Sequence, residues 1–173
     1  RLMRLLLGFD MILPLFGGQN MKIGGERMPT INRSALVMHS VDQMYQLIND
    51  INAYPSFLPD CNDSKVIAQD GQVVTAALLV SKGGLSKWFT TKNTLISNEK
   101  IKLSLVDGPF NKLEGFWLLT PLSEDACKIS LELEYEFSNK LVSLAFGKIF
   151  NHFSNTLVQA FTQRAKQVYG TSS

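Results

Sequence analysis

The alternation of apolar and polar residues divides the chain into a first strand and helix, a run of strands, and a long final helix. The segments with strand-like alternation are residues 31–38, 64–69, 72–81, 86–96, 101–107, 113–120 and 126–137. In the last of these, large apolar residues at odd positions from Ile129 to Phe137 alternate with three glutamates and a serine. This pattern is typical of an antiparallel strand with one face on the core and the other in water. We therefore interpret the glutamates as a solvated face, not as a catalytic or metal-binding cluster.

Two segments carry helical periodicity. The first begins after Ser40, where the sequence S-V-D-Q predicts a capping box with Gln43, and it ends before Pro55. Its expected apolar face consists of Val41, Met44, Tyr45, Leu47, Ile48 and Ile51. The second runs from Leu141 to about Tyr169, which at 1.5 Å per residue gives roughly 43 Å of helix. Its expected apolar stripe consists of Leu141, Leu144, Ala145, Phe146, Ile149, Phe150, Phe153, Leu157, Ala160, Phe161 and Val168.

The order of these segments predicts an α+β fold. Asp70-Gly71 is a strong turn signal between two of the strands, and no long connection separates the later ones. Consecutive strands joined by short turns form an antiparallel sheet, and the final helix is long enough to cross all of it. We expect a curved sheet with that helix laid across one face. Gly147 in the helix is expected to mark a bend or a close approach.

Composition and charge exclude several function classes. The chain is 45% hydrophobic and 18% charged, as in soluble globular domains. The net charge of +2 comes from residues 1–27, so the rest is neutral and bulk charge does not favour nucleic-acid binding. Cys61 and Cys127 form no metal or redox motif, and we expect reduced thiols. His39 and His152 have no recognisable catalytic partner, so we expect neither an enzyme nor a metal protein.

Residues 1–27 are expected to lie outside the folded domain, which we place at residues 28–170. The run RLMRLLLGFDMILPLFGG resembles a signal or anchor, but Asp10 and Pro14 interrupt it and it is too short to span a membrane. Translation of an upstream region, or a cloning remnant, is the favoured interpretation. An amphipathic segment on a membrane surface is the alternative.

The strand around residue 90 predicts an internal cavity. Thr91 and Asn93 share the inward phase with Phe89, because Lys92 marks the opposite phase as exposed. The final helix presents Phe146, Phe150, Phe153 and Phe161 near one side. Small or polar groups facing such a stripe favour a cavity with a few polar contacts. The alternative is that the aromatic stripe is ordinary core.

The opposite phase predicts an outward apolar patch. Trp88 lies in register with Lys92, and Phe116 and Leu118 lie in register with Glu114. Such residues can form a partner surface, although scattered exposed apolar residues are common. Lys82, Lys87, Lys92, Lys100 and Lys102 lie on neighbouring strands and could add local positive charge.

Several motifs together resemble one known family. They are MPTINRSALV, YPSFLPDC, VSKGGLSKWFTTKN, LVDGPFNKLEGFW, TPL, FSNKLVSLAFGKIF and VQAFTQRAKQVYG. Between Met28 and Gly170 the chain is similar to the START-like coenzyme Q-binding family, which is related to polyketide cyclase/dehydrase-type lipid-binding proteins and includes bacterial ribosome association toxins. The resemblance implies a helix-grip fold, in which a sheet wraps a long helix around an apolar tunnel. Asp60 departs from the Trp or Gly frequent in relatives, and Phe116 and Leu118 are more apolar than in the bacterial relative.

The resemblance also implies candidate ligands and sites. Family members bind isoprenoid quinones such as ubiquinone and support respiration, with no covalent cofactor. The ligand-binding residues that we expect are Tyr54, Phe57, Leu58, Pro59, Phe89, Thr91, Asn93, Leu105, Phe110, Trp117, Phe146, Phe150 and Phe153. The first four belong to the connector YPSFLPDC, which we expect to close one end of the tunnel. A simple structural corner is the alternative for that connector.

Two functions stay open at this point. As a carrier, the protein would hold a quinone with its head group near Asn93 or Thr91. As a ribosome association toxin, it would bind the large (50S) subunit and block formation of 70S particles. The partner-binding residues expected for that role are Lys82, Lys87, Trp88 and Lys92. We expect a cytoplasmic protein, with transient contact to the inner membrane as an alternative, and the oligomeric state stays open.

Overall fold

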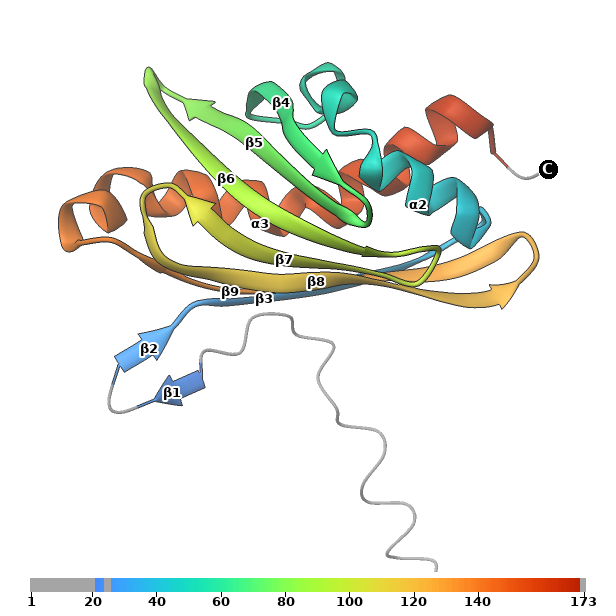
Figure 1. Ribbon diagram of the computed structural model, residues 1–173, viewed down its shortest axis with the longest axis horizontal. Coiled ribbons are helices and arrows are strands. Elements are labelled where there is room, and N and C mark those ends of the chain that lie inside the picture. The colour runs from blue at the N-terminus through green and yellow to red at the C-terminus, as the bar shows by residue number, and fades with distance from the viewer. Residues whose placement is uncertain (1–20, 24–25, 172–173) are drawn as a thin grey trace, which may run out of the picture.

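A seven-stranded antiparallel sheet wraps around one long helix (Figure 1). The computed structural model describes residues 21–23 and 26–171. The sheet consists of β3 (Thr30–Val37), β4 (Cys61–Asp70), β5 (Val73–Lys82), β6 (Leu85–Ile96), β7 (Lys100–Asp107), β8 (Phe110–Ser123) and β9 (Ala126–Phe137), in the order β3-β9-β8-β7-β6-β5-β4. Helix α3 (Lys140–Tyr169) crosses its inner face. The α+β helix-grip prediction is confirmed.

A helix and a 3-10 turn join β3 to β4. Helix α2 spans Val41–Asn49 and is followed by the 3-10 helix η1 (Ile51–Ser56), which contains Pro55. The predicted capping box is present, because the Ser40 Oγ accepts from the Gln43 amide at 3.1 Å and the Gln43 Oε1 accepts from the Ser40 amide at 3.0 Å. Together α2 and η1 cover the inner face beside α3 (Figure 1).

A short hairpin precedes the sheet and was not predicted. Its strands β1 (Met21–Ile23) and β2 (Glu26–Met28) pair with each other and form a separate two-stranded sheet. Residues 1–20 and 24–25 lie outside the described residues, so most of the predicted N-terminal extension is not tested.

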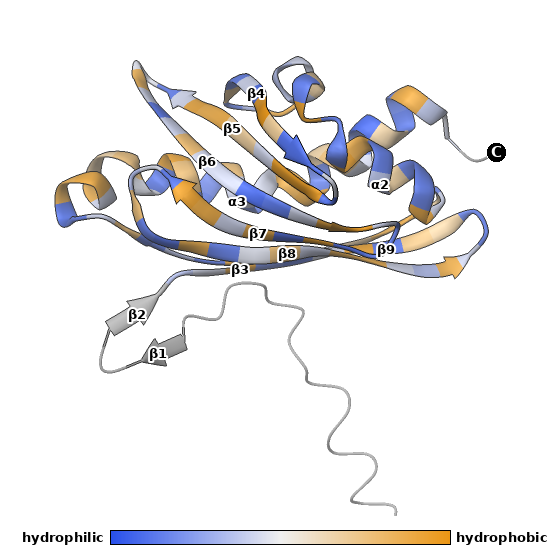
Figure 2. Ribbon diagram, in the orientation of Figure 1, coloured by the Kyte–Doolittle hydropathy of each residue, from blue (hydrophilic) through white to orange (hydrophobic). Residues whose placement is uncertain are grey.

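Alternation along the strands produces an inner and an outer face. The inner face, toward α3, carries the buried residues Phe89, Ile101, Leu113, Trp117, Leu131 and Tyr135. The outer face carries polar and charged residues such as Lys92, Lys102, Glu114 and Glu132. Figure 2 shows the resulting mixture of apolar and polar residues along each strand. The predicted inward phase of Thr91 and Asn93 is confirmed, since Asn93 pairs with buried Val74 and Thr91 with buried Ala76.

Helix α3 differs from its prediction at both ends and at Gly147. The side chains of Leu141 and Leu144 are 78% and 82% exposed, because the first turns extend beyond the strands (Figure 1), and Val168 is also exposed. A Cβ on Gly147 would lie 3.6 Å from the Phe137 ring, which is an ordinary contact, and the helix continues through it. The prediction of a stripe starting at Leu141 is therefore wrong, and there is no unusually close approach at Gly147. The alternative prediction of a bend at Gly147 is not tested.

Candidate ligand-binding cavity

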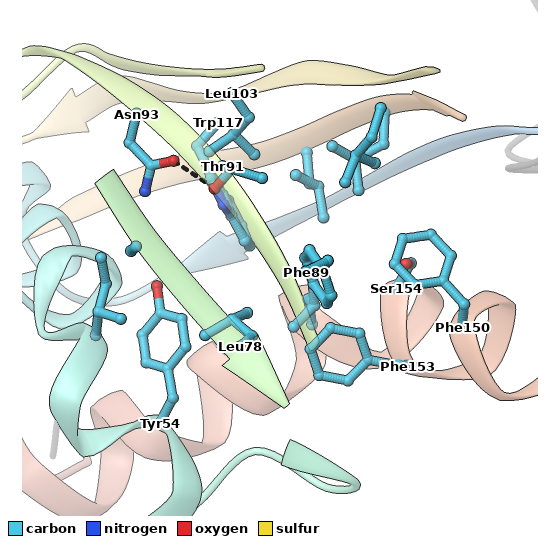
Figure 3. Close-up of a pocket in the computed structure, with 16 residues that line it drawn as sticks. Tyr54, Leu78, Phe89, Thr91, Asn93, Leu103, Trp117, Phe150, Phe153 and Ser154 are labelled. Carbon is cyan, nitrogen blue, oxygen red and sulfur yellow. Dashed lines mark hydrogen bonds between the residues drawn. The ribbon is translucent and has the colours of Figure 1, made fainter. Parts of the chain in front are cut away.

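A cavity of about 80 Å³ lies between the inner face of the sheet and α3 (Figure 3). Its walls come from η1, strands β5 to β9, and α3. The lining residues are Ile51, Tyr54, Ala76, Leu78, Phe89, Thr91, Asn93, Leu103, Leu113, Trp117, Leu131, Leu133, Phe150, Phe153, Ser154 and Leu157. A single buried water needs roughly 10–15 Å³, so this space can hold more than one small polar molecule or part of a ring.

The cavity exists because small residues meet on the inner face. On the sheet, Ala76 pairs with Thr91, and Leu103 pairs with Gly115. On the helix, Ser154 occupies a buried position between larger residues. Large side chains at these points would fill the space, because protein interiors pack as densely as organic crystals.

Four polar side chains line this apolar space. The Thr91 hydroxyl donates to the Asn93 Oδ1 at 2.7 Å, and the Asn93 side chain is buried. Ser154 is also buried, and its Oγ has no hydrogen-bond partner among the described residues. The Tyr54 hydroxyl donates to the backbone carbonyl of Ile48, and burial raises the pKa of Tyr54 well above its ordinary value. None of the lining residues in the described part of the chain is charged.

Aromatic rings stabilise the wall formed by α3. Phe150 lies 4.8 Å, between ring centroids, from both Phe110 and Tyr135, in edge-to-face geometry. It also approaches Phe89 at 5.7 Å. Edge-to-face pairs at these distances are favourable beyond the apolar area that they bury. Phe150 therefore belongs both to the core and to the cavity lining.

Seven of the residues predicted to bind ligand line this cavity, and six do not. The seven are Tyr54, Phe89, Thr91, Asn93, Trp117, Phe150 and Phe153. Leu58, Phe110 and Phe146 are buried core residues, and Leu105 packs against that core. Phe57 and Pro59 line a different groove. These six lie outside this cavity, because a residue can be apolar and inward without reaching the empty space, and their contact with a ligand stays a prediction.

The connector around Pro55 separates the cavity from that second groove. The groove has a volume of about 290 Å³ and is lined by Phe57, Pro59, Thr156, Gln159, Ala160, Gln163, Arg164 and Gln167. The Phe161 ring contacts Tyr54 on the cavity side and Phe57 on the groove side, at 5.4 Å in both cases. Of the connector YPSFLPDC, Tyr54 belongs to the cavity wall, and Phe57 and Pro59 belong to the groove, so closure of the tunnel by the whole connector stays a prediction.

Nine lining residues were not predicted. They are Ile51, Ala76, Leu78, Leu103, Leu113, Leu131, Leu133, Ser154 and Leu157. Most could be assigned to the inner face from alternation, but not to the cavity. Ser154 carried the clearest missed signal, since it is a hydroxyl four residues after Phe150 on an apolar helix stripe.

The outer face over β4 to β8 is basic and partly aromatic. The Lys65 Nζ lies 4.7 Å from the centre of the Trp88 ring, and the Lys100 Nζ lies 4.2 Å from the centre of the Phe116 ring. Lys92 and Lys102 share this face. We call Lys65, Trp88, Lys92, Lys100, Lys102 and Phe116 the basic outer patch.

Lys82 and Lys87 do not belong to the basic outer patch. Lys87 pairs with buried Val80 and shares the phase of Phe89, so it lies in the inner-face register, beyond the core. Lys82 follows Val80 by two residues and shares that register. The prediction of one outward cluster containing both lysines with Trp88 is therefore wrong, because neighbouring residues on a strand face opposite sides.

Of the remaining side chains considered for catalysis or metal binding, His39, Cys61 and Cys127 are buried in the fold. A His39 ring nitrogen lies 2.8 Å from the Gly170 carbonyl oxygen. Cys61 and Cys127 are free and buried, and burial raises the pKa of each thiol to about 11. Within the described residues, no group of three or more His, Cys, Asp or Glu side chains could hold a metal ion. None of the described helices combines the length and apolar character needed to cross a bilayer.

Comparison with known proteins agrees with this architecture. The chain is 54% identical over 142 residues to the ribosome association toxin RatA of Escherichia coli K12, covering 82% of this chain and 90% of that protein. It is 29% identical over 150 residues to the mitochondrial coenzyme Q-binding protein COQ10 homolog B of Xenopus laevis, covering 84% of this chain and 62% of that protein.

Structural similarity extends to proteins of low sequence identity. The crystal structure of the ZhuI aromatase/cyclase from Streptomyces superposes with a TM-score of 0.73 at 13% identity, covering 84% of this chain and 99% of that one. That likeness shows the fold. The family described as polyketide cyclase / dehydrase and lipid transport matches residues 37–162. The chain therefore belongs to the polyketide cyclase / dehydrase and lipid transport family, in which it groups with the RatA proteins.

Proposed function

We propose that the protein binds an isoprenoid quinone, such as ubiquinone, in the cavity and supports respiration without catalysing a reaction. The observation that carries this proposal is the lining: apolar walls, four polar side chains and no charge in the described residues. An ionised carboxylate or phosphate buried there would have no cation to compensate its lost hydration. A neutral ring with carbonyl oxygens and an apolar tail meets no such penalty. The name of the COQ10 relative adds support.

The size of the cavity sets a condition on this binding. Its volume of about 80 Å³ is well below the 300–1,000 Å³ typical of small-molecule sites. A head group with its tail needs more space, so loading requires the walls to separate. Those walls are side chains on separate elements, η1, the sheet and α3. Location in the cytoplasm, with peripheral contact at the inner membrane, is part of the proposal because an isoprenoid quinone is a membrane lipid.

Trp117 offers a direct test of quinone binding. It lines the cavity, whereas the only other tryptophan, Trp88, lies on the outer face. In a Trp88→Phe variant, adding decyl-ubiquinone should quench the fluorescence of Trp117 with saturation. The matched Trp117→Phe variant, which retains Trp88, should show no saturable quenching. Absence of saturable quenching in the first variant, together with no quinone in a lipid extract of purified wild type, would refute the carrier function.

A second candidate function is ribosome association through the basic outer patch. Two of the four lysines of this patch, Lys65 and Lys100, lie over aromatic rings, a combination that suits contact with RNA phosphates and bases. The name of the RatA relative supports the same partner. Under this proposal the protein binds the large subunit and blocks 70S formation.

Charge reversal tests this candidate without disturbing the cavity. The double variant Lys92→Glu, Lys102→Glu should abolish any shift from 70S particles to free subunits on overexpression, because phosphate contacts become repulsive. Its quinone content should stay unchanged. The control Lys140→Glu, Lys148→Glu reverses two exposed lysines on α3 and should keep the shift. A shift that persists in the outer-patch variant would rule out this surface as the ribosome site.

A further inference from the structure

Ser154 differs from the threonines on the same helix. Thr156 donates to the Phe153 carbonyl at 2.9 Å, and Thr162 donates to the Val158 carbonyl at 2.8 Å. Hydroxyls in helices commonly satisfy themselves in this way. Ser154 is only 1% exposed, yet its Oγ has no partner in the described part of the chain, and the residue lines the cavity. An unpaired buried hydroxyl is unfavourable, so its position indicates a partner inside the cavity.

The sheet wall presents a second donor. Asn93 is 8% exposed and lines the cavity, and its Oδ1 already accepts from the Thr91 hydroxyl. This bond orients the side-chain amide. The Nδ2 group makes no hydrogen bond among the described residues and remains available as a donor. An amide nitrogen can only donate. Figure 3 places Thr91 and Asn93 on the strand and Ser154 on the helix, so donors face the cavity from both walls.

We propose that Ser154 and Asn93 donate hydrogen bonds to the carbonyl oxygens of the bound ring, so that the cavity holds the oxidised quinone in preference to the hydroquinone. This inference rests on the quinone-binding function proposed above. A 1,4-quinone carries two acceptor oxygens on opposite sides of its ring and brings no donor. It can therefore accept a hydrogen bond from the donor on each wall, and it has no O–H group of its own that needs an acceptor.

The reduced form fits this set of groups less well. A hydroquinone brings two O–H groups that each need an acceptor. The amide oxygen of Asn93 already accepts one bond from Thr91, and the Tyr54 hydroxyl donates to Ile48. The acceptors left on the lining side chains are the second lone pair of that amide oxygen, which the bond to Thr91 holds in a fixed direction, and the lone pairs of hydroxyl groups. Burying one O–H that meets none of these acceptors in good alignment corresponds to roughly tenfold weaker binding. Thr91 acts as a positioning residue, because it fixes which end of the Asn93 amide faces the ligand.

Calorimetric titration with decyl-ubiquinone and anaerobically reduced decyl-ubiquinol tests the preference. Wild type should bind the oxidised form about tenfold more tightly. Ser154→Ala should weaken binding of the oxidised form several-fold while raising the midpoint of urea unfolding, because an unsatisfied hydroxyl is removed. The matched control Ser143→Ala, an exposed serine on the same helix, should change neither quantity.

Thr91→Val provides a separate test of amide orientation. Valine keeps the shape of threonine but removes the donor, so the Asn93 amide becomes free to turn its oxygen toward the cavity. The preference for the oxidised form should then shrink toward equality. Equal affinity of wild type for both forms, or tighter binding of the reduced form, would overturn the inference and leave quinone binding intact. Failure of wild type to bind either form would instead overturn the proposed function.

Discussion

The same strands form both faces of the sheet, but the inner face is buried and apolar whereas the outer face is exposed and charged. On the inner face, buried side chains such as Trp117 and Leu131 pack against α3 and surround a small uncharged cavity. On the outer face, Lys65 and Lys100 lie over aromatic rings, and Glu114, Glu132 and Glu134 occupy the strands toward β9. Burial makes the inner face sensitive to shape and hydrogen bonding, whereas solvent makes the outer face sensitive mainly to charge. Stability and the proposed ligand binding therefore depend on the inner face, and the proposed contact with a large partner depends on the outer face.

The largest difference between the faces should appear on truncating one aromatic ring from each. Phe150→Ala removes the ring at the centre of the aromatic wall and should cost about 3–5 kcal/mol of unfolding free energy, because a buried cavity is created. Phe116→Ala, on the half-buried outer face, should cost clearly less. Urea unfolding of both variants measures the difference. Similar losses in the two variants would contradict the assignment of Phe150 to the core.

Adding a single methyl group at Gly115, which lies in the inner-face register, should also lower the free energy of unfolding. A Cβ on Gly115 would lie 1.9 Å from the backbone carbonyl oxygen of Glu132, so the backbones of β8 and β9 would have to separate. Gly115→Ala should destabilise the protein by about 1–3 kcal/mol, as overpacking does. Gly71→Ala is less informative, because a positive φ of 57° adds its own strain there. Thermal unfolding of Gly115→Ala without loss of stability would show that the two strands can yield.

Alkaline pH should weaken the buried face selectively. Burial raises the pKa of Cys61 and Cys127 from the ordinary value of 9.0 to about 11, so the folded protein holds these protons more tightly than the unfolded chain. The stabilisation that comes from this difference in thiol pKa is fully present below pH 9.0 and is lost as the pH rises from 9.0 toward 11. Urea midpoints measured from pH 8 to 10.5 should fall. A smaller fall in the Cys61→Ala, Cys127→Ala double variant would assign the effect to the thiols.

The smallest effect on stability is expected for charge reversal on the outer face. Lys92→Glu with Lys102→Glu should change the unfolding free energy by no more than about 0.5 kcal/mol, because both side chains are exposed. Thermal unfolding checks this value before the ribosome experiment is interpreted. A large loss of stability would mean that the outer face contributes to the fold as well as to binding.

The sequence by itself determined the elements of this fold and the direction of most side chains. The capping box at Ser40, the turn at Asp70-Gly71 and the strand 126–137 were all predicted, because caps, turns and alternation depend on neighbours within a few residues. The same alternation placed Thr91 and Asn93 on the inner face. Lys82 and Lys87 were grouped with Trp88 without applying alternation, which puts Lys87 in the phase of Phe89.

Only the tertiary structure decided which inward residues border empty space. A cavity is the difference between the volume enclosed by separate elements and the volume of the side chains inside it, and periodicity along one element contains neither quantity. Packing therefore decided that Tyr54 reaches the cavity while Phe57 lies in the second groove, and that Leu141 extends past the sheet. It also left the Ser154 hydroxyl without a partner among the described residues, because that outcome depends on the strands that face the helix across the cavity.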